Sequence, residues 1–303
     1  MSLPFEIIID CPFSEFIDPK DERYENKRSL CLANDFEDGK WRLGRFIDFI
    51  FDNIGETALN ARERKALGEM AHSKLKSAAK KLRITDNDIA GGEISEILLY
   101  GIMRHHYNAL PIVPKIYYKQ NANDYAKGAD SVHIVIESPT EFSLWLGEAK
   151  FYNGVQNSQL DVIVKSVLDT LGTEKIRKEN TIIIGLNDIN ELGLSDELKN
   201  NIFKLLNEEI SIDKIKPILH IPICLLHECK ITQGTSIFDE EYVEKLRLQY
   251  INVAQRYFEK QLSLCEKVVT LYSKISFHFI LFPVPVKADV VNEFINTAKF
   301  YRK

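Results

Sequence analysis

The stretch that decides the fold runs from residue 92 to residue 152 and contains three short motifs. GEISEILLYG begins at Gly92, KGADSVH begins at Lys127, and LWLGEAKFY begins at Leu144. The first has apolar residues at helical spacing, and the other two have the alternating apolar residues of β-strands. Because Ser138-Pro139-Thr140 is a turn signal between the two strand patterns, they predict a β-hairpin.

The register of this hairpin brings two acidic residues together. Asp130 and Glu148 lie at equal distances from Pro139, so a hairpin centred there places them opposite each other. Directly opposed residues point to the same face of a sheet. Alternation then adds a shared apolar face, made of Val132, Ile134, Ile136, Phe142, Leu144 and Leu146. The same register opposes Glu137 to Glu141, which is mildly unfavourable.

Two neighbouring carboxylates at the edge of a core favour a bound cation. Like charges held side by side cost free energy unless a cation lies between them. Mg²⁺ takes oxygen ligands and keeps several waters, and Mn²⁺ is the alternative ion. Lys150 is expected on the same side, where it would orient a water or neutralise charge on a phosphodiester. A third acid would come from Glu93 or Glu96, near the beginning of a predicted helix whose dipole favours carboxylates.

The tripeptide Glu148-x-Lys150 is not specific by itself. Seven Asp/Glu-x-Lys triplets occur in the chain, and such a pair on a strand is commonly an exposed ion pair. The sequence HECK at 227–230 also follows an apolar strand pattern, but no Asp lies on a neighbouring hairpin. The opposed Asp130 therefore distinguishes the candidate site from the other triplets.

Composition indicates a folded intracellular protein. The chain has 303 residues, 45% of them hydrophobic, which is enough for one or two domains with a large core. The five cysteines are odd in number and include no C-x-x-C pair, which argues against a disulfide framework or a structural zinc site. We therefore expect a cytoplasmic protein. No apolar stretch approaches the length of a membrane span. The sequence contains no Walker motif, so we do not expect this chain to hydrolyse ATP.

Positive charge is concentrated in one region of an acidic chain. The net charge is −5, whereas residues 62–83 contain eight Lys or Arg and two Glu. A solvated helix face is the ordinary explanation; contact with the DNA backbone or with an acidic partner is the alternative. The candidate DNA-binding residues are Lys74, Lys76, Lys80, Lys81 and Arg83.

The order of predicted elements gives the fold class. We expect helices at 41–54, 56–82, 93–107, 157–171, 196–207, 240–264 and 290–301. We expect strands at 5–10, 112–118, 130–136, 141–150, 181–186, 218–226 and 275–282. This alternation predicts an α/β fold with a mixed sheet flanked by helices. A mainly helical N-terminal cap is expected at 1–90 and a core at 91–303.

Taken together, the three motifs resemble the PD-(D/E)xK nuclease superfamily. More narrowly, they resemble the HamA family, the effector subunits of bacterial Hachiman anti-phage systems. The resemblance covers residues 92–152 and implies a metal-dependent DNase with little sequence preference, restrained by a HamB-like helicase subunit. It implies that Asp130 and Glu148 are metal ligands and Lys150 the catalytic lysine.

The resemblance also bears on the less certain positions. Glu96 is the preferred helical acid and Glu93 the alternative, while Gln156 or Gln159 would match a glutamine that some branches carry. Ala129 stands where the superfamily often has proline. Two other functions stay open: a structure- or site-selective endonuclease, such as a resolvase or restriction enzyme, and a non-catalytic DNA-binding adaptor.

Overall fold

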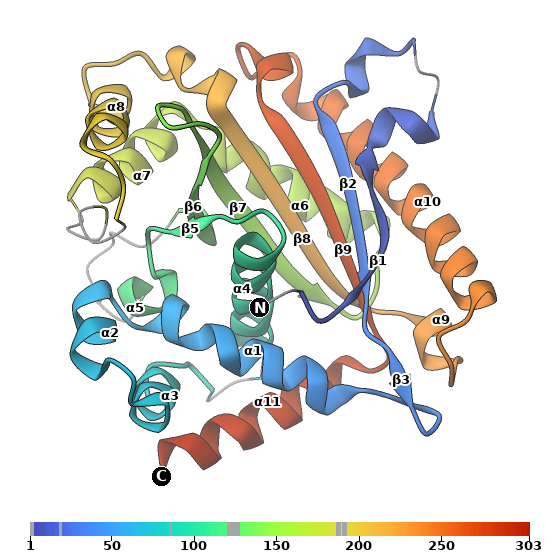
Figure 1. Ribbon diagram of the computed structural model, residues 1–303. Coiled ribbons are helices and arrows are strands. Elements are labelled where there is room, and N and C mark those ends of the chain that lie inside the picture. The colour runs from blue at the N-terminus through green and yellow to red at the C-terminus, as the bar shows by residue number, and fades with distance from the viewer. Residues whose placement is uncertain (1–2, 18–19, 85–86, 120–127, 186–188, 190–192) are drawn as a thin grey trace.

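A mixed β-sheet forms the centre of the computed structural model (Figure 1). The structure describes residues 3–17, 20–84, 87–119, 128–185, 189 and 193–303, so Lys127 of the second motif lies outside it. Within these residues the main sheet has seven strands in the order β1-β2-β9-β8-β7-β6-β5. They are β1 (Glu6–Pro12), β2 (Lys27–Ala33), β5 (Leu110–Pro111), β6 (Ser131–Ile136), β7 (Phe142–Tyr152), β8 (Leu219–Glu228) and β9 (Ser276–Val284).

The four central strands β2, β9, β8 and β7 are parallel to one another. The flanking strands β1, β6 and β5 pair in the antiparallel sense. A separate small hairpin joins β3 (Phe36–Glu37) and β4 (Lys40–Trp41). The parallel strands β7, β8 and β9 are apolar on both faces because helices cover both sides of the sheet.

The helices form two layers. One face of the sheet packs against α6 (Asn157–Thr170), α7 (Thr173–Gly185), α8 (Asp196–Leu206) and α10 (Glu240–Cys265). The opposite face packs against α1 (Leu43–Ala58), α3 (Ala71–Ala79), α4 (Asn87–His105), α5 (Lys115–Lys119) and α11 (Lys287–Arg302). Two short helices, α2 (Ala61–Leu67) and α9 (Lys230–Gln233), complete the α-helices of the described chain. Short 3₁₀ turns lie at Phe13–Phe16, Glu22–Tyr24, Ile212–Lys214, Lys216–Ile218 and Tyr272–Lys274.

The predicted class, a mixed sheet flanked by helices, is confirmed, and so is the register of the hairpin. Ser131 pairs with Gly147 and Ile136 with Phe142, the register that a turn centred on Pro139 requires. The predicted apolar face is buried except at Ile136, which is 42% exposed near the turn.

Three predicted elements are wrong. The helix expected at 56–82 is divided into α2 and α3, because Gly68 has a left-handed backbone (φ 48°) that ends α2. The segment expected as a strand at 112–118 contains α5 instead. The strand expected at 181–186 is the last part of α7, as far as Gly185. Short apolar runs of this length do not distinguish a strand from a buried helix.

Strand β2, which lies within the sheet between β1 and β9, is not predicted from the sequence. Consequently residues 1–90 supply strands as well as helices. The expected boundary at residue 90 does not separate two cores, since one apolar cluster includes Ile50 of α1, Leu98 of α4 and Phe282 of β9. Among the described residues, no helix is both long and apolar enough to cross a membrane.

Candidate active site

The open end of the β6–β7 hairpin brings Asp130, Glu148 and Lys150 together. The backbone N–H of Asp130 donates to the carbonyl oxygen of Gly147 (2.8 Å), which extends the ladder by one residue beyond β6. The Asp130 carboxylate Oδ2 then accepts a hydrogen bond from the backbone N–H of Ala149 (3.0 Å). Asp130 is therefore fixed against β7 through both its main chain and its side chain.

Three oxygen atoms converge on the ammonium group of Lys150. Its Nζ lies 2.9 Å from Asp130 Oδ2, 3.4 Å from Glu148 Oε2 and 3.1 Å from the carbonyl oxygen of Ala149. Two carboxylates and one backbone carbonyl are also the type of donor set that a hard divalent cation prefers. The ammonium group thus stands where a cation fits, and these residues would suit Mg²⁺ or Mn²⁺ if Lys150 lay aside.

Glu148 is held from the other side by two hydroxyl groups of α6. Ser166 Oγ donates to Glu148 Oε2 (2.7 Å), and Thr170 Oγ1 donates to Oε1 (2.6 Å). These two residues are four apart, so they lie on the same face of the helix. Glu148 is only 3% exposed, and its buried oxygens need these donors.

Ser166 and Thr170 are not predicted from the sequence. Gln156 and Gln159, the two glutamines that the resemblance suggests, form the capping box at the beginning of α6. The available signal was a hydroxyl pair at i and i+4 on a helix face that is otherwise apolar. That signal becomes informative only when α6 is known to pack beside the end of β7.

The site carries more negative than positive charge. Burial raises the pKa of Glu148, the Asp130 carboxylate adds to the rise, and Lys150 opposes it. Burial lowers the pKa of Lys150, but the carboxylates of Asp130 and Glu148 outweigh burial, so the pKa is raised overall. Two carboxylates and one ammonium group sum to −1 when all are ionised. Without the ammonium group the two carboxylates sum to −2, a charge that a divalent cation in its place would neutralise.

The structure does not bring the two helical acids into this group. The carboxylate of Glu93 accepts two hydrogen bonds from the backbone N–H of Arg83 (both 2.8 Å). Glu96 is half-buried on α4, which packs on the opposite face of the sheet from α6. Among the described residues, no three Asp, Glu, His or Cys side chains form a group able to hold a metal.

The candidate DNA-binding residues lie in and after α3, and several of them contact other parts of the protein. Lys76 Nζ donates to the carbonyl oxygen of Lys303 (2.6 Å), and Lys81 forms an ion pair with Glu63 (2.5 Å). Lys74 packs beside Gly55, whereas Lys80 and Arg83 are exposed. The break at Gly68 divides the basic stretch, so it does not form one continuous helical face.

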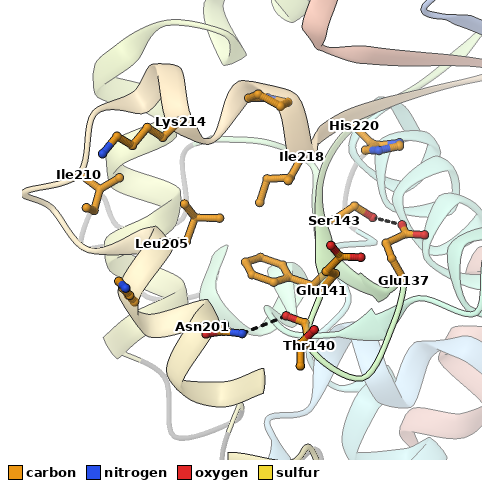
Figure 2. Close-up of a pocket in the computed structure, with 13 residues that line it drawn as sticks. Glu137, Thr140, Glu141, Ser143, Asn201, Leu205, Ile210, Lys214, Ile218 and His220 are labelled. Atoms are coloured by element: carbon orange, nitrogen blue, oxygen red, sulfur yellow. Dashed lines mark hydrogen bonds between the residues drawn. The ribbon is translucent and has the colours of Figure 1, made fainter. Parts of the chain in front are cut away.

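Two other regions are separate from this site. In the HECK segment, Glu228 accepts a hydrogen bond from the backbone N–H of Lys287 (2.9 Å), the first residue of α11, so its carboxylate has a structural role. Figure 2 shows a pocket of about 610 Å³ lined by Glu141, Leu205 and Lys214, among others. It lies at the turn end of the hairpin, where Ser143 is about 23 Å along β7 from Lys150 at roughly 3.3 Å per residue.

Comparison with known proteins identifies a family. The HamA family model matches residues 11–298 of the 303-residue chain. No match to the chain is found among curated proteins. The family match extends far beyond the three motifs, on both sides of them.

Proposed function

The chain belongs to the HamA family of the Hachiman antiviral defence system, and from this premise we propose that it is a Mg²⁺-dependent deoxyribonuclease. The nuclease would be the effector of the system and would hydrolyse DNA phosphodiesters with little sequence specificity. The observation that carries the proposal is the convergence of three oxygens on Lys150 Nζ at the end of the hairpin.

The proposed ion site uses Asp130 and Glu148 as its charged ligands and the carbonyl oxygen of Ala149 as a neutral one. A bound Mg²⁺ supplies Lewis acidity and lowers the pKa of a coordinated water. Ser166 and Thr170 keep the Glu148 carboxylate oriented, as outer partners of metal ligands do. The donor set supports the proposal without a helical acid.

Lys150 would contribute positive charge to the reaction. Beside the two carboxylates its pKa is raised, and a lysine that has moved away from them is still protonated at neutral pH, because its ordinary pKa is about 10.4. With an ion held by the two carboxylates, Lys150 would face the phosphodiester and would also orient the attacking water. An ammonium group held next to the phosphoryl oxygens stabilises the negative charge that develops on them.

The partners are part of the same proposal. Family membership supports a helicase subunit, HamB-like, that restrains the nuclease in the cytoplasm until foreign DNA is sensed. The acidic net charge suits an enzyme that does not bind DNA permanently. Exposed Lys80 and Arg83 would supply local contacts with the DNA backbone.

DNA degradation with matched variants tests the proposal. Plasmid and linear DNA are incubated with Mg²⁺ and wild type, Glu148→Gln, Lys150→Ala or, as the control, Glu259→Gln on the exposed side of α10. The helicase subunit and ATP are present in parallel reactions. We expect wild type and the control to degrade both DNAs and the two site variants to be at least about 100-fold slower.

Other outcomes would change the function. Equal degradation by Glu148→Gln would contradict the proposed site. Products confined to junctions or to one sequence would indicate the selective endonuclease. Absence of cleavage with the helicase subunit, ATP and DNA all present would favour the non-catalytic adaptor.

A further inference from the structure

We propose that Glu179, anchored by Lys115, is a positioning residue that fixes Asp130 for metal binding. The inference rests on the proposed function, because it concerns the geometry of the same ion site. Glu179 lies on α7 and Lys115 is the first residue of α5, and neither has been assigned a part in the site described above.

Glu179 and Lys115 form a buried ion pair. Lys115 Nζ lies 2.8 Å from both carboxylate oxygens of Glu179, and each side chain is 2% exposed. Removing two charges from water costs several kcal/mol per ion, and apolar residues of similar size often pack at least as stably. A role that depends on the hydrogen-bonding geometry of the pair would explain its presence in the interior.

The carboxylate has a further contact that leads directly to the site. Glu179 Oε1 accepts a hydrogen bond from the backbone N–H of Ala129 (2.9 Å), the residue before Asp130. Gly128 lies so close that a Cβ atom there would overlap Glu179 Oε1. The side chain of Glu179 therefore meets two consecutive residues of the chain immediately before Asp130.

Two successive backbone amides therefore donate hydrogen bonds to two different elements. The N–H of Ala129 is bound to α7 through Glu179, and the N–H of Asp130 is bound to β7 through Gly147. These two bonds hold the two successive peptide planes on either side of Ala129, and thereby the backbone position from which the Asp130 side chain extends. Metal ligands need placement within about 0.5 Å, and a displacement of about 1 Å can cost about 100-fold in rate.

The contact between Gly128 and Glu179 can be tested by adding one carbon atom at residue 128 and removing one at residue 179. Glu179→Asp keeps the charge for Lys115 but withdraws the carboxylate from Ala129. Gly128→Ala pushes a methyl group against the carboxylate, and the double variant gives that methyl group room. Tyr250→Phe is the control, since it removes a buried hydrogen bond to Phe279 (2.8 Å) elsewhere in the core.

Mn²⁺ is the probe, and its binding is followed by the loss of the electron paramagnetic resonance signal of the free ion. We expect each single variant to bind Mn²⁺ about tenfold more weakly than wild type. If the two substitutions acted independently, the double variant would bind Mn²⁺ about 100-fold more weakly than wild type. We expect the double variant to differ from either single variant by less than about twofold. DNA cleavage should show a lower kcat with an unchanged KM for DNA, and the control should bind Mn²⁺ as wild type does.

The outcomes separate this inference from the proposed function. If wild type binds Mn²⁺ and Glu179→Asp binds it equally well while its Tm falls, the pair is only structural and the inference is overturned. If wild type binds no Mn²⁺, the proposed metal site fails and the inference fails with it. If Gly128→Ala does not fold, Glu179→Asp compared with Tyr250→Phe still decides the question.

Discussion

At the scale of single residues, the environment of Glu148 decides the chemistry. Its oxygens accept hydrogen bonds from two hydroxyl groups of α6 and from Lys150, in a position almost closed to solvent. A buried carboxylate without such donors tends to take up a proton rather than stay charged. Ser166 and Thr170 therefore favour the ionised form that binds a cation.

Removing the hydroxyl donors should weaken the site without touching the three central residues. The variant Ser166→Ala/Thr170→Val loses the two hydrogen bonds that lower the pKa of Glu148. The effect of burial is then opposed less, so this pKa rises further. Under the proposed function, the acid limb of the pH–rate profile moves to higher pH and the rate at neutral pH falls about 10- to 100-fold. Cleavage rates measured from acid to alkaline pH would show this.

The control for this pair is Ser158→Ala, an exposed serine on the same helix. It should leave the profile unchanged. An unaltered acid limb in Ser166→Ala/Thr170→Val would contradict the role given to the hydroxyl groups.

At the scale of elements, one close approach between helices governs packing on the α4 side of the sheet. A Cβ atom at Gly101 of α4 would lie 2.5 Å from Phe49 Cζ of α1 and 3.0 Å from Asn53 Nδ2. Since α1 and α4 are both buried here, the neighbouring ring has little room to move. The glycine is needed for the distance between the helices.

Gly101→Ala should therefore destabilise the protein, by about 1–3 kcal/mol in the free energy of unfolding. Gly92→Ala is the matched control on the same helix, because a Cβ atom at this position would have no neighbour within 4 Å. An alanine at that position should be neutral or stabilising by up to about 1 kcal/mol. Urea unfolding of both variants measures the difference, and equal stabilities would refute the packing argument.

The elements also show what the sequence can predict. The β6–β7 register followed from alternation and one proline turn, so the meeting of Asp130 with Glu148 was predictable from local pattern. The contacts of Ser166, Thr170 and Glu179 depend on which helix faces the end of β7 and the beginning of β6. These are long-range facts that no local pattern contains.

The misassigned segments have local causes. Residues 181–185 read as a strand because Ile182, Ile183 and Ile184 are β-branched, yet they belong to the end of α7. β2 begins with Lys27 and Arg28, which made it read as irregular, although its remaining residues are buried in the sheet. In both cases tertiary packing overrides the local preference.

At the scale of the whole molecule, a lysine side chain is buried against aromatic rings of the core. Lys27, at the beginning of β2, is fully buried, with Nζ 2.7 Å from Asn26 Oδ1 and 4.4 Å from the centre of the Tyr272 ring. Burial lowers the pKa of Lys27 from 10.5 to about 7, although Glu266 and Cys265 oppose the change. Folding therefore favours the neutral amine.

This group makes stability depend on pH. Between about pH 7 and pH 10 the unfolded chain binds the proton of Lys27 more tightly than the folded chain does. The contribution of Lys27 to the free energy of unfolding therefore increases as the pH rises. Lys27→Met should remove that dependence and should be more stable than wild type at neutral pH. Urea unfolding across this range tests it, with exposed Lys267→Met as the control. A parallel pH dependence in wild type and Lys27→Met would contradict the assignment.

The central claim is that the oxygens around Lys150 Nζ form a divalent cation site, and locating the ion tests it most directly. Crystals of the protein soaked in Mn²⁺ would be measured at the manganese absorption edge. We predict one anomalous peak between Asp130 and Glu148, with Lys150 turned away from both, and no peak there in Glu148→Gln. Manganese bound only elsewhere, or Lys150 still between the two carboxylates at saturating Mn²⁺, would contradict the account.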